Sequence, residues 1–340
     1  MVGNGSVKKA KFAIFGAGAW GSAMALHLAA QGHAVRLVAR DRDWANATEE
    51  IRENRDYLPG FPFPPNLHID GDFGAIRWAD GAFLACSTAG VLEYCRRIGA
   101  EAPANPPPLI TLCKGFVPET GQLPLAVVEE ILPNFPRGTL SGPTHAGDIA
   151  LGHPAAAVLA VHLEAERLKC LQEWINGPKF RVYRTSDLLG VELGGSLKNP
   201  YAIGLGIAER FAGSGNGRAA LFTRMMAEMV RIGVALGGRA ETFYGLSGLG
   251  DLMATGSCDW SRNRTFGLRI GAGENPTAII AQEKTTVEGY RATKGFHRIC
   301  AERGISCPVL DGIHGILYEG VPPEMIGDSL MSRALREESG

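Results

Sequence analysis

The feature that most constrains this chain is a short apolar segment that ends in a glycine-rich turn. Residues 11–21 read KFAIFGAGAWG, with glycines at positions 16, 18 and 21. The small and apolar residues that follow, 22–31, predict a helix that ends at Gly32 in a left-handed conformation. Residues 34–39 (AVRLVA) then predict a second strand. Strand, turn, helix and strand follow one another within about 30 residues, which is the spacing of a βαβ unit.

The three glycines have different roles in such a turn. Gly16 permits the tight bend, Gly18 lets the backbone approach a pyrophosphate, and Gly21 lets the helix pack closely on the strand. The N-terminus of the helix adds unpaired N–H groups and a partial positive charge. A glycine-rich turn that binds nothing is the alternative, but both flanking elements are present. The segment therefore predicts a Rossmann-type dinucleotide-binding fold.

The residues after the second predicted strand bear on which dinucleotide is bound. In NAD-binding proteins a carboxylate roughly 20 residues beyond the glycines holds the ribose 2′-hydroxyl. This chain has Arg40 nineteen residues after Gly21, followed directly by Asp41. An arginine can pair with a 2′-phosphate, whereas Asp41 keeps an acid close by; a solvated surface cluster is the alternative. We predict NADP or NAD as the cofactor, with NADP favoured.

Length and composition narrow the remaining possibilities. A chain of 340 residues predicts two domains. The 34 basic and 35 acidic residues nearly cancel, which argues against nucleic acid or an anionic membrane as a partner. No apolar run approaches the ~20 residues of a membrane span, and the first residues lack the apolar core of a signal peptide. The seven scattered cysteines form no CxxC or His/Cys cluster, so we expect no metal site and a cytoplasmic protein.

Strand and helix patterns divide the chain in two. In the first part apolar runs alternate with helical or loop segments, which favours a mostly parallel sheet buried on both faces. These runs are 81–86, 109–114, 138–142, 155–160 and 180–185. From about residue 186 the patterns are helical: 188–209, 218–233 and 286–303. We therefore expect an α/β protein with an N-terminal Rossmann-type dinucleotide-binding domain (1–187) and an all-helical substrate and catalytic domain (188–340).

The helical part contains the segment ELGGSLKN at residues 192–199. Gly194 and Gly195 precede Lys198 by four and three residues, so a helix places the lysine side chain over them. Each glycine costs about 1 kcal/mol in a helix interior, which indicates close approach by another group. A pocket in front of the ammonium is one explanation; helix packing on the glycines, with a solvated lysine, is the other. Pro200 is expected to kink this helix.

Two later segments also carry candidate chemistry. GLSGLGDL at 245–252 predicts a glycine-rich turn that leads into a helix at Asp251. In SRNR at 261–264, Arg262 offers a planar fork of donors and Asn263 a neutral amide donor, which suits an anion clamp. A basic surface turn is the alternative for SRNR.

Together these segments resemble bacterial NAD(P)-dependent glycerol-3-phosphate dehydrogenase over nearly the whole chain. The resemblance is carried by GAGAWG (16–21), CKG (113–115), SGPTHA (141–146), ELGGSLKN (192–199), RAALFTRMMAEM (218–229), GLSGLGDL (245–252), SRNRTFG (261–267) and VEGY (287–290). It implies reversible hydride transfer between NAD(P)H and dihydroxyacetone phosphate, which supplies glycerol 3-phosphate for phospholipid synthesis. It also implies a homodimer.

The resemblance assigns site residues position by position. Lys198 matches the family's catalytic lysine and Asp251 its acidic partner, while Lys114 can add positive potential. The implied substrate-binding residues are Lys114, Gly142, Thr144, Lys198, Asp251, Ser261, Arg262 and Asn263. The implied cofactor-binding residues are Gly16, Gly18, Ala19, Trp20, Gly21, Arg40, Lys114, Ala146, Arg262, Thr286 and Glu288.

The assigned residues fit the chemistry of ketone reduction. A lysine ammonium within reach of a carbonyl oxygen can donate a proton and stabilise the developing negative charge. Lys198 is therefore the acid/base candidate, Asp251 is expected to orient it, and His145 is the rival proton donor. The chain departs from the family pattern at Pro200, Gly217 and Asp148. Two alternatives stay open: a different hydroxyacid dehydrogenase, or a non-catalytic NADP-binding sensor.

Overall fold

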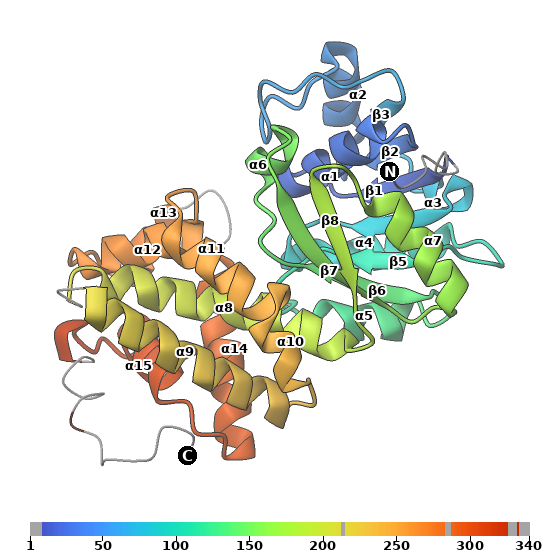
Figure 1. The fold of residues 1–340 in the computed structure, drawn as a ribbon. Helices are drawn as coiled ribbons and strands as arrows, with labels where there is room; N and C mark the ends of the chain where they lie inside the picture. The colour runs from blue at the N-terminus through green and yellow to red at the C-terminus, as the bar shows by residue number, and fades with distance from the viewer. Residues whose placement is uncertain (1–8, 212–214, 283–286, 326–331, 333–340) are drawn as a thin grey trace. The chain divides into compact units, whose positions relative to one another are not determined.

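The computed structural model describes residues 9–211, 215–282, 287–325 and 332. The chain divides into two compact units, unit 1 over residues 1–192 and unit 2 over residues 193–340. All the described strands lie in unit 1, and the elements described wholly within unit 2 are helices (Figure 1). Within the described ranges, no helix is both long and apolar enough to cross a membrane.

Unit 1 is built on one eight-stranded sheet (Figure 1). Its strands are β1 (Lys11–Phe15), β2 (Ala34–Val38), β3 (Leu67–Asp70), β4 (Gly81–Leu84), β5 (Leu109–Thr111), β6 (Arg137–Ser141), β7 (Ala155–Val161) and β8 (Phe180–Arg184). Their order across the sheet is β3-β2-β1-β4-β5-β6-β7-β8, and only the β6–β7 pair is antiparallel. The first six strands have the order of a dinucleotide-binding fold. The predicted Rossmann-type, mostly parallel sheet is therefore confirmed.

The central strand β1 shows that the sheet is buried on both faces. Phe12 and Ile14 belong to one apolar cluster, together with residues of the helices α1 and α7. Ala13 and Phe15 belong to a second cluster, with residues of α4 and α5. Successive side chains of a strand point to opposite faces, so helices must cover both. The helical elements of unit 1 are α1 (Ala19–Ala30), α2 (Arg42–Ile51), α3 (Ala75–Trp78), η1 (Thr88–Gly90), α4 (Val91–Ala100), α5 (Pro124–Ile131), α6 (Ala146–Ala150) and α7 (Ala165–Ile175).

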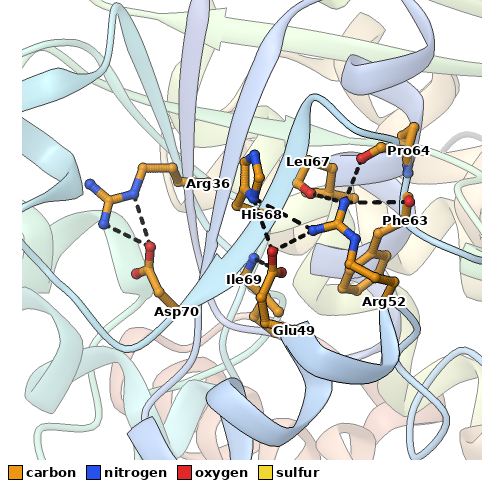
Figure 2. A network of polar contacts seen from close by, with 9 residues as sticks. All are labelled: Arg36, Glu49, Arg52, Phe63, Pro64, Leu67, His68, Ile69 and Asp70. Carbon is orange, nitrogen blue, oxygen red and sulfur yellow. Dashed lines mark hydrogen bonds and ion pairs between the residues drawn. The ribbon is translucent and has the colours of Figure 1, made fainter.

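The edge strand β3 was not predicted, because its four residues, LHID, are too few and too polar for a clear pattern. A polar network fixes it instead (Figure 2). Glu49 of α2 accepts hydrogen bonds from the Ile69 amide and the His68 ring, both at 2.9 Å. Arg52, which ends α2 in a left-handed conformation (φ 58°), donates to the carbonyl of Leu67. Tertiary hydrogen bonds therefore determine a strand that local propensity does not.

Unit 2 is assembled around one long helix that begins in unit 1. The elements are α8 (Leu188–Ala208), α9 (Gly215–Ala235), α10 (Ala240–Tyr244), the π-helical turn η2 (Leu246–Gly250), α11 (Asp251–Ser257), α12 (Arg262–Gly271), α13 (Pro276–Gln282), α14 (Glu288–Arg303) and α15 (Pro308–Tyr318). The predicted helices at 188–209 and 218–233 are confirmed. Pro200 lies inside α8, and the helix continues beyond it to Ala208.

A buried polar contact joins three of these helices. The hydroxyl of Tyr201 on α8 donates to Glu228 of α9 at 3.0 Å. Glu228 also accepts from the amides of Val309 and Leu310 at the start of α15, at 2.9 and 2.8 Å. Desolvation raises the pKa of Glu228 to about 7. This carboxyl therefore caps α15 and fixes it against the helix that carries Lys198.

Candidate active site

The glycine turn of unit 1 lies between β1 and α1, and each glycine has a separate structural reason. Gly16 has a φ of +121°, and a Cβ there would lie 2.6 Å from the backbone of Ala85. A Cβ on Gly21 would lie 1.9 Å from the carbonyl oxygen of Gly16. Apart from the adjoining backbone, a Cβ on Gly18 would meet no atom of the described residues within 4 Å. The protein itself therefore requires Gly16 and Gly21, whereas the space beside Gly18 is open.

The first turn of α1 fits the phosphates of a dinucleotide. Gly18 is the N-cap residue, and no side chain caps the helix there. The first turn of a helix has N–H groups without intrahelical partners, and these favour an anion. The buried Nε1 of Trp20, in the same turn, has no hydrogen-bond partner among the described residues. Open space at Gly18 and an unsatisfied donor at Trp20 are both consistent with a cofactor at this turn.

Arg40 and Asp41 follow the carboxyl end of β2, and their side chains differ in how strongly they are bound by other residues. The Asp41 carboxylate accepts hydrogen bonds from the amides of Asp43 and Trp44, at 2.9 and 3.0 Å, so it caps α2. The Arg40 side chain is 68% exposed, and its guanidinium is 3.9 Å from the Glu93 carboxylate. Exposed pairs at this distance are weak. Arg40 is therefore the more available of the two for a ribose or its 2′-phosphate.

Three of the predicted substrate-binding residues converge on one carbonyl in unit 1. Lys114 follows β5, and its ammonium donates to the carbonyl oxygen of Gly142 at 3.2 Å. The hydroxyl of Thr144 donates to the same oxygen at 3.1 Å. Gly142 directly follows β6, the neighbour of β5, and has a φ of +144°. Because parallel strands end at one edge of the sheet, residues distant in sequence meet there. Ala146 lies close by in sequence, at the start of α6, which packs on α1.

The lysine of unit 2 is held by two partners in a buried environment. The Lys198 ammonium lies 2.9 Å from an Asp251 carboxylate oxygen and 2.6 Å from the Thr255 hydroxyl. The side chains of Lys198 and Asp251 are only 9% and 3% exposed. The Thr255 hydroxyl also donates to Asp251 at 3.2 Å. Sequence reasoning paired Lys198 with Asp251 but assigned no role to Thr255. Its spacing from Asp251 could have indicated a role, because Thr255 follows Asp251 by four residues and residues four apart share a helix face.

Local structure explains why these side chains meet. Asp251 is the first residue of α11, as predicted, and it directly follows the π-helical turn η2. That turn packs on Gly194 of α8, where a Cβ would lie 3.0 Å from the Ser247 carbonyl oxygen. Of the two explanations for this glycine, packing against protein is therefore the one observed. It does not leave the lysine solvated, because close packing brings α11 to Lys198.

The SRNR segment begins α12 rather than forming a surface turn. Ser261 is the N-cap residue, and its hydroxyl accepts from the Arg264 amide at 3.2 Å. The Asn263 side chain donates to the Asn199 side chain at 2.9 Å and accepts from the Gly289 amide at 3.0 Å. Arg262 is exposed and has no ion pair with another described residue. The segment therefore fixes α12 against α8 and α14 while its first arginine reaches solvent.

Thr286 and Glu288 are the last two predicted cofactor-binding residues. Glu288 is the first residue of α14, after the N-cap residue Val287. Thr286 lies outside the described residues. His145, the rival proton donor, precedes α6 and its ring lies 3.2 Å from the Asp148 carboxylate. Asp148 lies in the first turn of α6, so the contact stays within unit 1.

A Rossmann-type unit with an open glycine turn, joined in one chain to a helical unit with a buried lysine–aspartate pair, defines a nucleotide-dependent dehydrogenase with a helical second domain. Comparison with known protein families identifies the kind of dehydrogenase. Family models described as the N-terminus and C-terminus of NAD-dependent glycerol-3-phosphate dehydrogenase match residues 11–167 and 187–328. The chain belongs to the NAD-dependent glycerol-3-phosphate dehydrogenase family.

Individual relatives agree with the family match. A curated protein of Janthinobacterium sp. (strain Marseille), named glycerol-3-phosphate dehydrogenase (NAD(P)+), is 41% identical over 96% of this chain and 98% of its own length. The crystal structure of glycerol-3-phosphate dehydrogenase from Coxiella burnetii is 34% identical with a TM-score of 0.88, covering 96% of this chain and 99% of that one. A D-mandelate dehydrogenase structure has a TM-score of 0.60 at 14% identity, covering 93% and 99% of the two chains. That last likeness shows a shared fold alone.

Proposed function

We propose that this protein is an NAD(P)-dependent sn-glycerol-3-phosphate dehydrogenase that reduces dihydroxyacetone phosphate reversibly. The observation that carries the proposal is the buried contact of Lys198 with Asp251 and Thr255, in a chain that belongs to this family throughout. A non-catalytic sensor has no use for a buried ammonium held by two partners, because burying charge is costly unless it is paired.

Lys198 is the proposed acid and base. An ammonium held at 2.9 and 2.6 Å from two fixed acceptors cannot rotate freely, so its position towards a substrate carbonyl is set in advance. It donates a proton to the carbonyl oxygen during reduction and accepts one from the hydroxyl during oxidation. Asp251 favours the charged form of Lys198. Thr255 orients both groups through its hydroxyl.

The substrate phosphate is proposed to bind at α12. Arg262 offers a guanidinium without an ion-pair partner in the described part of the chain. Asn263 uses one of its two side-chain N–H groups on Asn199, and its second N–H remains for the substrate. Ser261 supports the arrangement as the cap of α12. Lys114, Gly142 and Thr144 are proposed to contact the substrate from the edge of the sheet.

The dinucleotide is proposed to bind at the glycine turn, with its pyrophosphate over Gly18 and α1. When bound, it supplies or accepts the hydride. Trp20 and Arg40 provide an indole donor and a guanidinium towards it. The further proposed contacts are Ala19, Lys114, Ala146, Arg262, Thr286 and Glu288. We also propose the domain roles of 1–187 and 188–340, a homodimer in the cytoplasm, and supply of glycerol 3-phosphate for phospholipid synthesis.

One assay tests the proposed function against its alternatives. Purified protein is mixed with NADPH or NADH, and cofactor oxidation is followed with and without dihydroxyacetone phosphate. We expect oxidation that depends on this substrate and yields sn-glycerol 3-phosphate. Oxidation with 2-keto acids in its place would identify another hydroxyacid dehydrogenase. Cofactor binding without turnover on either substrate class would identify a sensor.

A further inference from the structure

Two cysteines of unit 1 follow neighbouring strands at the same level. In the parallel β4–β5 pair, Leu84 lies opposite Thr111. The register continues beyond the strands, since the Leu112 amide donates to the Leu84 carbonyl at 2.8 Å. Two residues further on, this register puts Cys86 opposite Cys113. Side chains at matched positions of paired strands lie on the same face of the sheet.

The thiol of Cys113 contacts the Cys86 residue. It donates a hydrogen bond to the carbonyl oxygen of Cys86 at 3.1 Å. Neighbouring strands lie about 4.8 Å apart, which is within the Cα–Cα range of disulfides. Both cysteines are reduced in this structure. The pair can therefore be joined without a large movement of the backbone.

The pair lies directly behind the candidate cofactor site. The amide nitrogen of Cys86 is 2.6 Å from where a Cβ on Gly16 would be, so the glycine turn rests on the Cys86 backbone. Cys113 directly precedes Lys114, whose ammonium contacts Gly142. A protein interior is close-packed and transmits small displacements. Pulling the two sulfur atoms together would therefore shift the Gly16 turn and the Lys114 backbone.

We propose that Cys86 and Cys113 are a modification site at which a hydroperoxide forms a disulfide that weakens dinucleotide binding. One thiolate attacks the peroxide and becomes a sulfenic acid, releasing hydroxide or alkoxide. The second thiol displaces water from the sulfenic acid and forms the S–S bond. Both thiols are oxidised, the peroxide is reduced, and hydrogen peroxide yields two molecules of water in total. A reducing thiol reverses the bond by exchange.

The accessibility and ionisation of the two thiols determine the rate of this reaction. Cys86 is partly exposed, whereas Cys113 is buried. Burial raises the pKa of the Cys86 thiol. Because the thiolate is the reactive form, oxidation is slow at neutral pH and becomes faster as the pH rises. The site therefore responds to sustained oxidation rather than to a brief pulse.

Peptide mapping tests the bond without any measurement of turnover. Trypsin releases residues 78–96, which contain Cys86 and Cys95, and residues 98–114, which contain Cys113. After treatment of the native protein with hydrogen peroxide, we expect these two peptides to be linked and to separate on reduction. The Cys95→Ser variant should keep the link and Cys86→Ser should lose it. An absent link, or one that persists in Cys86→Ser, overturns the proposal.

Cofactor binding tests the consequence. We expect the Kd for NADPH to rise about tenfold on oxidation, equivalent to about 1.4 kcal/mol, and to recover with dithiothreitol. The Cys86→Ser variant should bind NADPH equally well before and after peroxide. Cys300→Ser replaces a buried cysteine of unit 2, and this variant should remain as sensitive as the unmodified chain. A linked protein with unchanged NADPH affinity overturns the proposal even if the enzyme proves to be active.

Discussion

The two units present their candidate site residues in different ways. In unit 1 the turn at 16–21 offers backbone groups: α1 follows the N-cap residue Gly18 without a side-chain cap, and the space beside that glycine is open. In unit 2 the chemistry depends on side chains, because Lys198 is buried against Asp251 and Thr255. Backbone donors can hold the pyrophosphate of any dinucleotide, whereas a held ammonium suits one kind of reaction. In the proposed function, the turn therefore determines the class of cofactor, and the lysine cluster determines the chemistry.

The glycines of the two units sharpen this difference. A glycine in a sequence predicts close approach but does not say what approaches. Among the described residues, apart from the adjoining backbone, no atom lies within 4 Å of a Cβ built on Gly18, whereas a Cβ on Gly194 would meet the backbone of Ser247. The first glycine leaves room for a ligand, and the second lets η2 pack on α8. Substitutions at the two glycines should therefore impair different properties, cofactor binding in unit 1 and stability in unit 2.

The largest effect is expected from Lys198→Ala. Loss of general acid catalysis should lower kcat by ~10²–10⁴-fold, while the Kd for NADPH should stay nearly unchanged because the proposed pyrophosphate contacts are at the glycine turn. Steady-state kinetics and cofactor titration measure the two quantities. Lys294→Ala, an exposed lysine of α14, is the matched control and should retain activity. A Lys198→Ala enzyme with more than about a tenth of the normal kcat would contradict the assignment of this residue.

Arg262→Ala is expected to act on KM more than on kcat. A charge-assisted contact of ~1.5–3 kcal/mol with phosphate is lost, so KM for dihydroxyacetone phosphate should rise about 10- to 100-fold. The KM for the cofactor should also rise if Arg262 reaches it. Arg269 on the same helix is paired with Glu274, so Arg269→Ala is the control. Unchanged KM values for Arg262→Ala would mean that this arginine is an ordinary surface group.

Much of the fold and part of the site could be predicted from the sequence. The turn at 16–21 and the helix that starts at Asp251 were recognisable because glycine conformation and helix periodicity are local properties. What packs on Gly194 could not be predicted, since the Ser247 backbone reaches it through tertiary structure. The double engagement of Asn263 with Asn199 and Gly289 is likewise non-local.

The paired substitutions Gly18→Ala and Gly194→Ala compare the two units directly. Gly18→Ala adds a methyl group to open space, so Tm should stay nearly constant while KM for NADPH rises about tenfold, or about 1.4 kcal/mol. Gly194→Ala adds one at 3.0 Å from the Ser247 carbonyl oxygen, and overpacking should cost about 1–3 kcal/mol of stability. Thermal unfolding and cofactor titration separate the outcomes. Equal losses of stability in both variants would contradict the difference drawn between these glycines.

Arg40→Asp tests how unit 1 distinguishes the two cofactors. The substitution removes a guanidinium and puts like charge beside a 2′-phosphate, so kcat/KM for NADPH should fall ~10-fold or more. NADH has no 2′-phosphate, and its kcat/KM should fall much less, or rise as the carboxylate accepts ribose hydroxyls. Arg42→Asp, two residues further on in α2, is the control for a general change of charge. Equal effects on NADPH and NADH would show that Arg40 does not read the phosphate.

The smallest effect concerns Glu192, the first residue of the ELGGSLKN segment in α8. It is buried and accepts a hydrogen bond from the Leu125 amide at 2.8 Å. Desolvation raises its pKa to about 8 from an ordinary value of 4.5. A raised pKa means that the folded state binds the proton more tightly than the unfolded state does. The contribution of this proton to the free energy of unfolding is therefore complete below about pH 4.5 and is lost as the pH rises towards 8.

Glu192→Gln copies the protonated side chain and cannot titrate. Between about pH 5 and pH 8, the free energy of unfolding should therefore fall less in the variant than in the unmodified chain. The two decreases should differ by about 1 kcal/mol or more. Urea unfolding at both pH values measures the difference. A slope should remain in the variant, because Glu228 of unit 2 also has a raised pKa, about 7. Identical pH dependence in the two proteins would mean that Glu192 is ionised in the folded state, and that the start of α8 holds a buried charge as Lys198 does.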